Sequence, residues 1–264
     1  MVSLDLIRAP LFVPANRPER FAKAAATETD AVILDLEDAV GPDVKDAARA
    51  ELRCDFTSKP VLVRINARGT SWHEADLAAV RTLPVAGVIL PKAEEDTEAV
   101  CRLLDGRIPL LALIETARGL AHARSIAALP GVARLVFGSI DYCADLGCAH
   151  ERDILLPARS ELVLAARLAS RPGPIDGVTA RLDDPSETRS DAEHARALGM
   201  TGKLCIHPAQ VPEVLKGFAP TAQEIEWAEH VLGAGEGAVA VDGAMIDEPV
   251  RLRARHILKA AQRS

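Results

Sequence analysis

Short apolar runs recur along the chain, and most are followed by a polar cluster and then by a stretch with helical spacing. Eight runs have the composition of buried strands: Leu11–Val13, Ala31–Leu36, Val61–Ile65, Gly87–Leu90, Leu110–Ile114, Leu135–Phe137, Ile175–Val178 and Lys203–Ile206. Most start about 20 to 30 residues after the previous run, which is the length of a strand–helix unit. Strands that alternate with helices predict a parallel sheet, and eight units predict an α/β fold closed into a TIM-like (β/α)8 barrel.

The last part of the chain departs from this pattern. Thr221–Leu232 is predicted to form a helix, and a glycine-rich segment, 233–237, follows it. Two short apolar stretches then flank Asp242–Gly243, a dipeptide that favours a tight hairpin turn. Pro249–Ala261 is predicted to form the last helix. This order indicates a hinged appendage that can move over another part of the molecule.

Two parts are therefore expected, a catalytic barrel domain over residues 1–220 and a C-terminal helix, hinge and lid segment over 221–264. The length of 264 residues fits, because α/β barrels often run to about 250 residues as one domain. Hydrophobic residues make up 48% of the chain but aromatic residues only 3%, so the core must be aliphatic. Aliphatic side chains suit buried parallel strands.

Composition excludes several classes of protein. The net charge of −7 argues against a nucleic-acid partner, because phosphate binding needs a basic surface. No stretch reaches the roughly 18 apolar residues of a membrane span, and the N-terminus lacks the pattern of a secretory signal. A cytoplasmic protein is expected. The five cysteines are odd in number and form no Cys-x-x-Cys pair, so neither a disulfide framework nor a structural zinc site is expected.

Polar residues gather at one end of the predicted strands. In a parallel barrel the carboxyl ends of the strands face the active site. The residues at or just after those ends are Asn16, Arg17, Asp35, Glu37, Asp38, Arg64, Asn66, Lys92, Glu115, Ser139, Asp141, Thr179 and His207. The opposite ends carry far fewer ionisable groups. This asymmetry predicts a site at the carboxyl-end rim.

Glu115 and Asp141 lie at the ends of neighbouring predicted strands, so their carboxylates could share one cation. A site with few protein oxygen ligands suits Mg2+, which keeps waters and takes further ligands from substrate. Zinc would require His or Cys ligands, and His207 is the rim's single histidine. The alternative is that both acids form rim ion pairs with Arg64 or Lys92.

Arg64 faces a predicted acidic set, Asp35, Glu37 and Asp38. A guanidinium held by these acids could bind a carboxylate or stabilise an enolate oxygen. The alternative is a structural ion-pair network under the barrel mouth. Two further residues have ordinary interpretations: His207 as a loop histidine bonded to backbone, and Asp247 as a surface acid on the tail hairpin.

Nine short motifs in order resemble one family. They are Leu11–Pro14, Asp35–Asp38, Val63–Asn66, Leu90–Lys92, Ile114–Gly119, Gly138–Asp141, Asp176–Val178, Gly202–Pro208 and Asp242–Asp247. Over about Arg8 to Leu258 the chain resembles the citrate lyase β-subunit-like branch of the HpcH/HpaI aldolase/citrate lyase family. Ala15 stands where relatives often have glycine.

The resemblance implies a TIM-like barrel, bound Mg2+ and an acyl-CoA or acyl-thioester substrate. It assigns the metal to Glu115 and Asp141, and the substrate to Arg64, Glu115 and Ser139. It places a catalytic acid/base at Asp247, on a lid that covers the site of a neighbouring subunit in a homotrimer or homohexamer.

Asp35, Glu37 and Asp38 would hold Arg64 in place. Arg8, Lys92 and His207 are additional candidates at the site, and Arg8, Arg17 and Lys45 are candidates for contacts with CoA phosphates.

The implied reaction is a retro-Claisen cleavage of a short β-hydroxyacyl-CoA, of malyl, citramalyl or citryl type, to an α-keto acid and acetyl-CoA. The same residues would serve a malate-synthase-like condensation with thioester hydrolysis. A citrate lyase β subunit that depends on an acyl carrier protein, and a pyruvate-dependent aldolase acting on free acids, are further alternatives. The sequence alone does not separate the first two, while the intact set Glu115, Asp141, Arg64 and Asp247 speaks against a subunit without catalytic activity.

Overall fold

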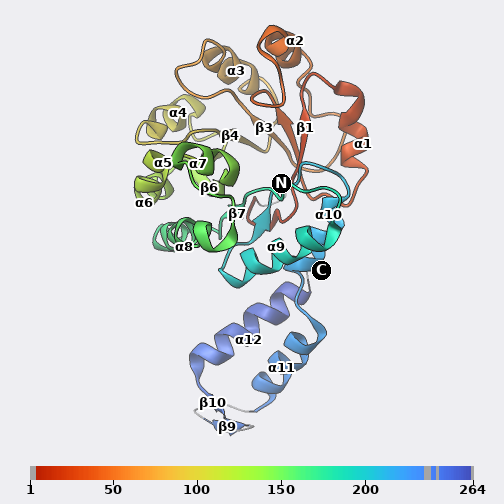
Figure 1. The fold of residues 1–264 in the computed structure, drawn as a ribbon, viewed down its shortest axis with the longest axis vertical. Coiled ribbons are helices and arrows are strands. Elements are labelled where there is room, and N and C mark those ends of the chain that lie inside the picture. Colours follow the sequence, from red (N-terminus) through yellow and green to blue (C-terminus); the bar gives the residue numbers. More distant parts are fainter. Residues whose placement is uncertain (1–3, 235–238, 242–243, 263–264) are drawn as a thin grey trace.

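The computed structural model describes residues 4–234, 239–241 and 244–262, and its centre is an eight-stranded parallel sheet (Figure 1). The strands are β1 Leu11–Pro14, β2 Val32–Asp35, β3 Val61–Arg64, β4 Gly87–Leu90, β5 Leu110–Ile114, β6 Val132–Phe137, β7 Ile175–Asp176 and β8 Gly202–Lys203. They neighbour one another in sequence order. The amide of Lys203 donates to the carbonyl of Arg8 (2.7 Å), and the amide of Phe12 donates to that of Cys205 (2.9 Å). These bonds join the last strand to the first and confirm the predicted barrel.

Helices follow the strands and surround the barrel (Figure 1). They are α1 Phe21–Ala25, α2 Lys45–Ala50, α3 His73–Val80, α4 Thr97–Leu104, α5 Ala117–Ala121, α6 Ala123–Ala128, α7 Ser139–Leu146, α8 Arg152–Leu168, α9 Pro185–Ala197 and α10 Gln210–Phe218. Three 3-10 helices, Leu4–Leu6, Pro18–Arg20 and Pro42–Val44, lie in the same part of the chain. No helix in the described ranges is long and apolar enough to cross a membrane.

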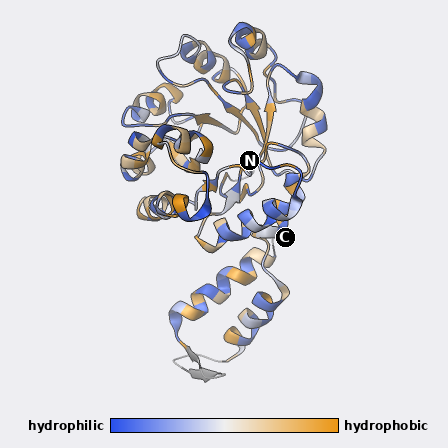
Figure 2. Cartoon of the chain, in the orientation of Figure 1, coloured by the Kyte–Doolittle hydropathy of each residue, from blue (hydrophilic) through white to orange (hydrophobic). Residues whose placement is uncertain are grey.

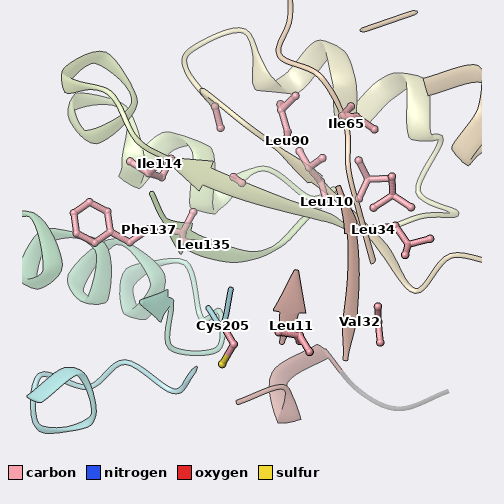
Figure 3. Packing of buried hydrophobic residues seen from close by; sticks show 14 of the residues in the cluster. Leu11, Val32, Leu34, Ile65, Leu90, Leu110, Ile114, Leu135, Phe137 and Cys205 are labelled. Atoms are coloured by element: carbon pink, nitrogen blue, oxygen red, sulfur yellow. The ribbon is translucent and has the colours of Figure 1, made fainter. Parts of the chain in front are cut away.

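Alternation along the strands divides the core into two layers. One cluster joins strand residues such as Leu34, Leu90 and Phe137 to the helices (Figure 3). The second contains the intervening strand residues, which fill the barrel interior: Ile7, Ala31, Ile33, Leu62, Ile89, Leu111, Leu113, Val136, Ile175 and Leu204. Figure 2 shows the apolar strands at the centre and polar stripes on the outer faces of the helices. Because successive side chains point to opposite faces, these clusters fix which strand residues can reach the barrel mouth.

Several boundaries differ from the sequence-based prediction. β7 and β8 have only two residues each. The short helices α7 and α10 were not predicted. The apolar spacing of Pro157–Ala169 predicts a helix from Pro157, but the helix begins at Arg152. It accommodates Pro157 internally because the buried positions Leu155, Ala158 and Leu162 keep helical spacing on both sides of it.

The C-terminal residues form an arm that projects from the barrel (Figure 1). It consists of α11 Ala222–Gly233, the antiparallel strands β9 Val239–Val241 and β10 Ala244–Ile246, and α12 Glu248–Ala261. A small apolar cluster, including Ala228, Val231, Ile246, Ala254 and Ile257, holds the two helices together. A capping box between Thr221 and Glu224 begins α11, as predicted. The predicted turn Asp242–Gly243 and most of the glycine-rich segment lie outside the described residues.

Candidate active site

The strand pattern places three ionisable side chains at the inner face of the barrel mouth. Asp35, Arg64 and Glu115 each lie two residues beyond an interior core residue, namely Ile33, Leu62 and Leu113. The period of two therefore turns all three inwards. Asp35 and Arg64 are also register partners in the parallel pair of β2 and β3. Their neighbouring Cα positions explain why the two side chains meet.

Arg64 is held by carboxylates along its whole guanidinium. Its Nε and Nη2 donate to the two oxygens of Asp35, each at 2.7 Å, so the pair is bidentate. Its Nη1 lies 3.0 Å from Glu37 Oε2 and 3.4 Å from Asp38 Oδ2. The 3.0 Å contact is an ion pair that lacks the angles of a hydrogen bond. This geometry fixes the direction of the guanidinium plane.

The surroundings keep Arg64 charged. Burial by itself would lower the pKa of Arg64, but the hydrogen bonds and charges of Asp35, Glu37 and Asp38 outweigh it and raise that pKa. The guanidinium carbon also lies 4.8 Å from the centre of the Phe12 ring. Asp35 accepts two backbone amide bonds as well, from Glu37 (2.9 Å) and Ala39 (3.0 Å). The carboxylate of Asp35, which holds Arg64, is thus itself held by the backbone after β2.

The side chain of Glu115 packs against Gly138, where the absence of a Cβ leaves room for its carboxylate. The Glu115 residue is 1% exposed, and a Cβ at position 138 would overlap its carboxylate and its own Cβ. Glu115 Oε1 accepts the amide of Lys92 at 2.8 Å, and Lys92 Nζ lies 3.8 Å from the same oxygen. Lys92 adopts a φ of 47°, a left-handed conformation that costs a non-glycine residue about 1 kcal/mol or more. The contacts with Glu115 and Glu37 hold it there.

The negative charge at Glu115 is only partly compensated. Burial, reinforced by the charges of Glu37 and Asp141, raises the pKa of Glu115 to about 8, although Lys92 acts in the opposite direction. Asp141 lies in the first turn of α7, close enough to act on Glu115 electrostatically. Burial similarly raises the pKa of Glu37, against the lowering effect of Arg64. Acidic groups therefore crowd one side of the barrel mouth.

A cavity of about 450 Å3 connects these groups. Its lining brings together Asp35, Asp38, Arg64, Glu115, Ser139 and Asp141 with an apolar wall that includes Phe12, Leu113, Phe137, Val178, Leu204 and Ile206. A larger cavity of about 670 Å3 lies at the opposite ends of the strands, beside Arg8 and Thr201. The smaller cavity is the candidate site, because it alone of these two joins paired carboxylates to a fixed cation.

The structure does not bring every predicted residue to this cavity. Arg8 precedes β1 and lines the cavity at the amino-terminal face. His207 is exposed, and its Nδ1 accepts the amide of Ala209 at 3.2 Å, which matches the alternative of a loop histidine bonded to backbone. Asp247 caps α12 by accepting the amide of Val250 at 3.2 Å. It directly follows β10, at the end of the arm far from the barrel (Figure 1).

Two candidates for CoA phosphates have other partners. Lys45 is 5% exposed, and its Nζ donates to the carbonyls of Leu36 and Glu37, both at 2.8 Å. Its ammonium is therefore used inside the protein. Arg17 is exposed beyond β1 and pairs with Glu19 at 2.7 Å. An exposed pair of this kind is weak enough to exchange for a phosphate.

Sequence reasoning missed a second buried ion network beside the cavity. Arg159 Nε donates to Asp176 Oδ1 at 2.9 Å, and Lys203 Nζ donates to Asp176 Oδ2 at 3.2 Å. Lys203 Nζ also donates to the carbonyl of Gly177 at 2.7 Å. Burial would raise the pKa of Asp176, but Lys203 and Arg159 outweigh it and lower that pKa. Arg159 lies inside a helix far along the chain, so no local motif signalled it.

A second missed contact involves Ser139, which is 1% exposed. Its Oγ lies 2.9 Å from Nε2 of His150, a residue of the segment between α7 and α8. A Cβ at position 177 would overlap the Ser139 hydroxyl, so glycine there allows the close packing of β7 against α7. His150 follows no apolar run, which is why strand-end reasoning did not find it.

The donor set suits Mg2+. The carboxylates of Glu115 and Asp141 line one cavity, and carboxylate oxygens are the hard ligands that Mg2+ prefers. Among the described residues, no group of three or more His, Cys, Asp and Glu side chains is arranged to hold a metal ion. A site of two carboxylates is typical of Mg2+ and unlike the ligand sets of zinc.

Comparison with known proteins agrees with this chemistry. The sequence model of the family described as HpcH/HpaI aldolase/citrate lyase matches residues 8–208. A citrate lyase subunit beta-like protein of Deinococcus radiodurans is 41% identical over 277 residues and is covered to 96%, as is the present chain. A (3S)-malyl-CoA thioesterase of Cereibacter sphaeroides is 34% identical over 270 residues, covering 97% of this chain and 94% of that protein.

A solved structure is similar over almost its whole length. It is the protein CitE from Mycobacterium tuberculosis in complex with magnesium, acetoacetate and coenzyme A. Its TM-score is 0.89 and its sequence identity 39%, and the match covers 98% of this chain and 100% of that one. The similarity includes the arm as well as the barrel, since so much of both chains is covered.

Proposed function

Because the chain belongs to the HpcH/HpaI aldolase/citrate lyase family, a family of lyases, we propose that it is a Mg2+-dependent carbon–carbon lyase. Its substrate is a short β-hydroxyacyl-CoA of malyl, citramalyl or citryl type, and its products are an α-keto acid and acetyl-CoA. The observation that carries this proposal is the meeting of Glu115, Asp141 and a carboxylate-clamped Arg64 at one cavity. Related proteins with bound magnesium and coenzyme A support it.

Each residue has a role in the cleavage. Glu115 and Asp141 would hold Mg2+, which supplies Lewis-acid stabilisation to the hydroxyl and carboxylate oxygens of the substrate. The carbinol hydroxyl gives its proton to solvent water and its carbon becomes the keto carbonyl, while the bond between that carbon and its neighbour opens and its electron pair moves into the thioester. Arg64 stabilises the enolate oxygen that results, because its guanidinium is fixed before the reaction begins. A proton from Asp247 to the enolate carbon completes acetyl-CoA.

Asp247 serves a site other than that of its own barrel in this proposal. It lies at the far end of the arm, and the cavity lining does not include it. The arm over residues 221–264 would cover the barrel mouth of a neighbouring subunit in a homotrimer or homohexamer and exclude water from the enolate. A cytoplasmic location belongs to the same proposal.

Thioester hydrolysis is the second candidate function. It is favoured by the 34% identity to a protein named (3S)-malyl-CoA thioesterase. The same carboxylates and Arg64 would serve that reaction, and a carrier-protein-bound thioester would also fit the open cavity. The reaction products distinguish carbon–carbon cleavage from thioester hydrolysis.

A substrate panel tests the proposal. We expect purified protein with Mg2+ to release a keto acid from one of malyl-CoA, citramalyl-CoA, citryl-CoA and hydroxymethylglutaryl-CoA. Glu115→Ala should abolish the release, while Glu161→Ala, on the outer side of α8, should leave it unchanged. Silence across the panel from a folded, Mg2+-binding protein would contradict the proposal and favour a carrier-bound substrate.

A further inference from the structure

The hydrogen bond between Ser139 and His150 lies between two cavities. Ser139 lines the cavity that holds Glu115 and Asp141. His150 lines a neighbouring cavity of about 540 Å3, together with Arg152, Arg159 and other polar residues. Ser139 is the first residue of α7, two positions before Asp141. A change at this hydroxyl therefore acts beside the metal ligand without removing it.

Donors are scarce in the cavity. Its ionisable lining residues Asp35, Asp38, Glu115 and Asp141 are acceptors once ionised. Arg64 directs Nε and Nη2 to Asp35 and Nη1 towards Glu37 and Asp38. Apart from Arg64, whose guanidinium the proposed function assigns to the enolate oxygen, the Ser139 hydroxyl is the side-chain donor that the lining residues offer. A substrate carboxylate seated near Glu115 and Asp141 needs such a donor, because the carboxylates around it repel it.

We propose that His150 is a positioning residue that aims the Ser139 hydroxyl at the substrate. The imidazole donates its Nε2–H to Ser139 Oγ, so the hydroxyl proton is left to point into the cavity, towards the carboxylate of the keto-acid half. His150 touches neither the metal ligands nor the reacting atoms and acts through Ser139. The inference rests on the proposed function for the identity of the anion.

The surroundings of His150 suit this role. Partial burial, together with the charges of Arg159 and Lys203, lowers the pKa of His150, which favours the neutral ring. A neutral ring has a single N–H, and in this proposal Nε2 carries it, so that Ser139 Oγ accepts and its own proton is free. The segment that carries His150 is short and fixed at both ends. Gly147 ends α7 with a φ of 67°, and Glu151 is the N-cap of α8.

A double-mutant cycle tests the proposal with pyruvate as the probe. We expect His150→Leu to weaken pyruvate binding to the Mg2+-loaded protein about tenfold in calorimetry, the usual effect of one lost hydrogen bond to a charged group. Ser139→Ala should have the same effect, and the double variant should be no weaker than either. His150→Gln, which retains an N–H near the Nε2 position, should stay within about threefold of wild type. Mg2+ affinity should be unchanged in all four.

Each contrary result has a definite meaning. Wild-type affinity in His150→Leu, additive effects in the double variant, or a parallel loss of Mg2+ affinity would overturn the positioning role. Absence of pyruvate binding by the wild-type protein would overturn the assignment of the hydroxyl to a carboxylate. If the coupled loss of pyruvate binding is seen while no thioester is cleaved, the positioning role stands and the lyase proposal fails.

Discussion

At the scale of single residues, Glu115 is the side chain whose charge is least well compensated. It is buried beside Glu37 and Asp141, and Lys92 Nζ, at 3.8 Å, is its nearest cation in the described part of the chain. Lys92 lies within ion-pair distance of Glu115, as one interpretation of the acids expects. Lys92 does not offset the effect of burial, so a divalent cation would stabilise the ionised carboxylate further, as the proposed function requires.

This environment predicts how stability depends on pH. In the metal-free protein the pKa of Glu115 is raised to about 8 from its ordinary 4.5. Between these values the folded chain keeps a proton that the unfolded chain has lost, so Glu115 makes stability fall as pH rises through this window. Mg2+ needs the ionised carboxylate, so its stabilising effect should grow over the same window.

Thermal unfolding in EDTA from pH 5 to 9 checks this prediction. Glu115→Gln should remove part of the decline in Tm, and the difference between variant and wild type should be largest near pH 8. With saturating Mg2+ the part of the wild-type decline that Glu115 causes should disappear. Identical pH profiles for wild type and Glu115→Gln would show that the pKa of Glu115 is not raised in the folded protein.

The residues of the site differed in how visible they were in the sequence. Asp35, Arg64 and Glu115 could be placed at one rim because each ends an apolar run and a period of two sets its direction. The bond of Ser139 to His150 could not be predicted, because it depends on how a segment between two helices folds back. Lys45 was misjudged for a similar reason, since its burial depends on the turn after β2.

At the scale of elements, Arg134 of β6 links several segments of the chain at the amino-terminal face of the barrel. This fully buried side chain donates to the carbonyls of Leu4 (2.9 Å), Ile7 (2.7 Å) and Gly173 (2.9 Å) and to Thr201 Oγ1 (2.7 Å). Burial lowers the pKa of Arg134 to about 10, so it stays charged at neutral pH. It ties the N-terminal segment to the starts of β7 and β8.

Removal of this side chain should destabilise the fold without touching the site. We expect Arg134→Leu to lower the free energy of unfolding by about 3 kcal/mol, because several buried acceptors lose their donor together. The exposed Arg107→Leu should change it by about 0.5 kcal/mol or less. Urea denaturation measures both. An Arg134→Leu variant as stable as Arg107→Leu would mean that water replaces the guanidinium.

The types of the strands and helices were predicted more accurately than their boundaries. All eight strands are present, since apolar runs of this composition need burial on both faces. α7 was overlooked because it is short and because its first turn consists of residues that had been assigned to the site. The start of α8 was placed too late, because Pro157 resembles a first-turn proline while tertiary packing carries the helix back to Arg152.

At the scale of the whole molecule, the barrel and the arm separate the proposed acid from the proposed metal ligands. A site that contains both the acid and the metal ligands would therefore have to be formed by residues of two chains. Hydrophobic pattern could predict the barrel, because its contacts lie between consecutive units. It could not predict the direction of the arm, which depends on few contacts and, in this account, on a second subunit.

Mixed oligomers test the exchange of arms between subunits. Glu115→Ala and Asp247→Asn should each be inactive as pure proteins. Co-expressed in equal amounts, they should recover about a quarter of wild-type activity, because one site in four combines an intact barrel with an intact arm from another chain. No recovery in verified mixed oligomers would show that Asp247 acts within its own chain, and an active pure Asp247→Asn protein would show that it has no role.

The central claim, that this chain cleaves a carbon–carbon bond, is tested most directly by following both halves of one substrate. Malyl-, citramalyl- and citryl-CoA labelled with 13C at the carbinol carbon would be incubated with Mg2+ and protein and observed by NMR, while free thiol is titrated. The account predicts that the label appears as a keto-acid carbonyl, with an equal amount of acetyl-CoA and no free thiol. Free thiol with the label still at a hydroxyl-bearing carbon would contradict it and identify a thioesterase.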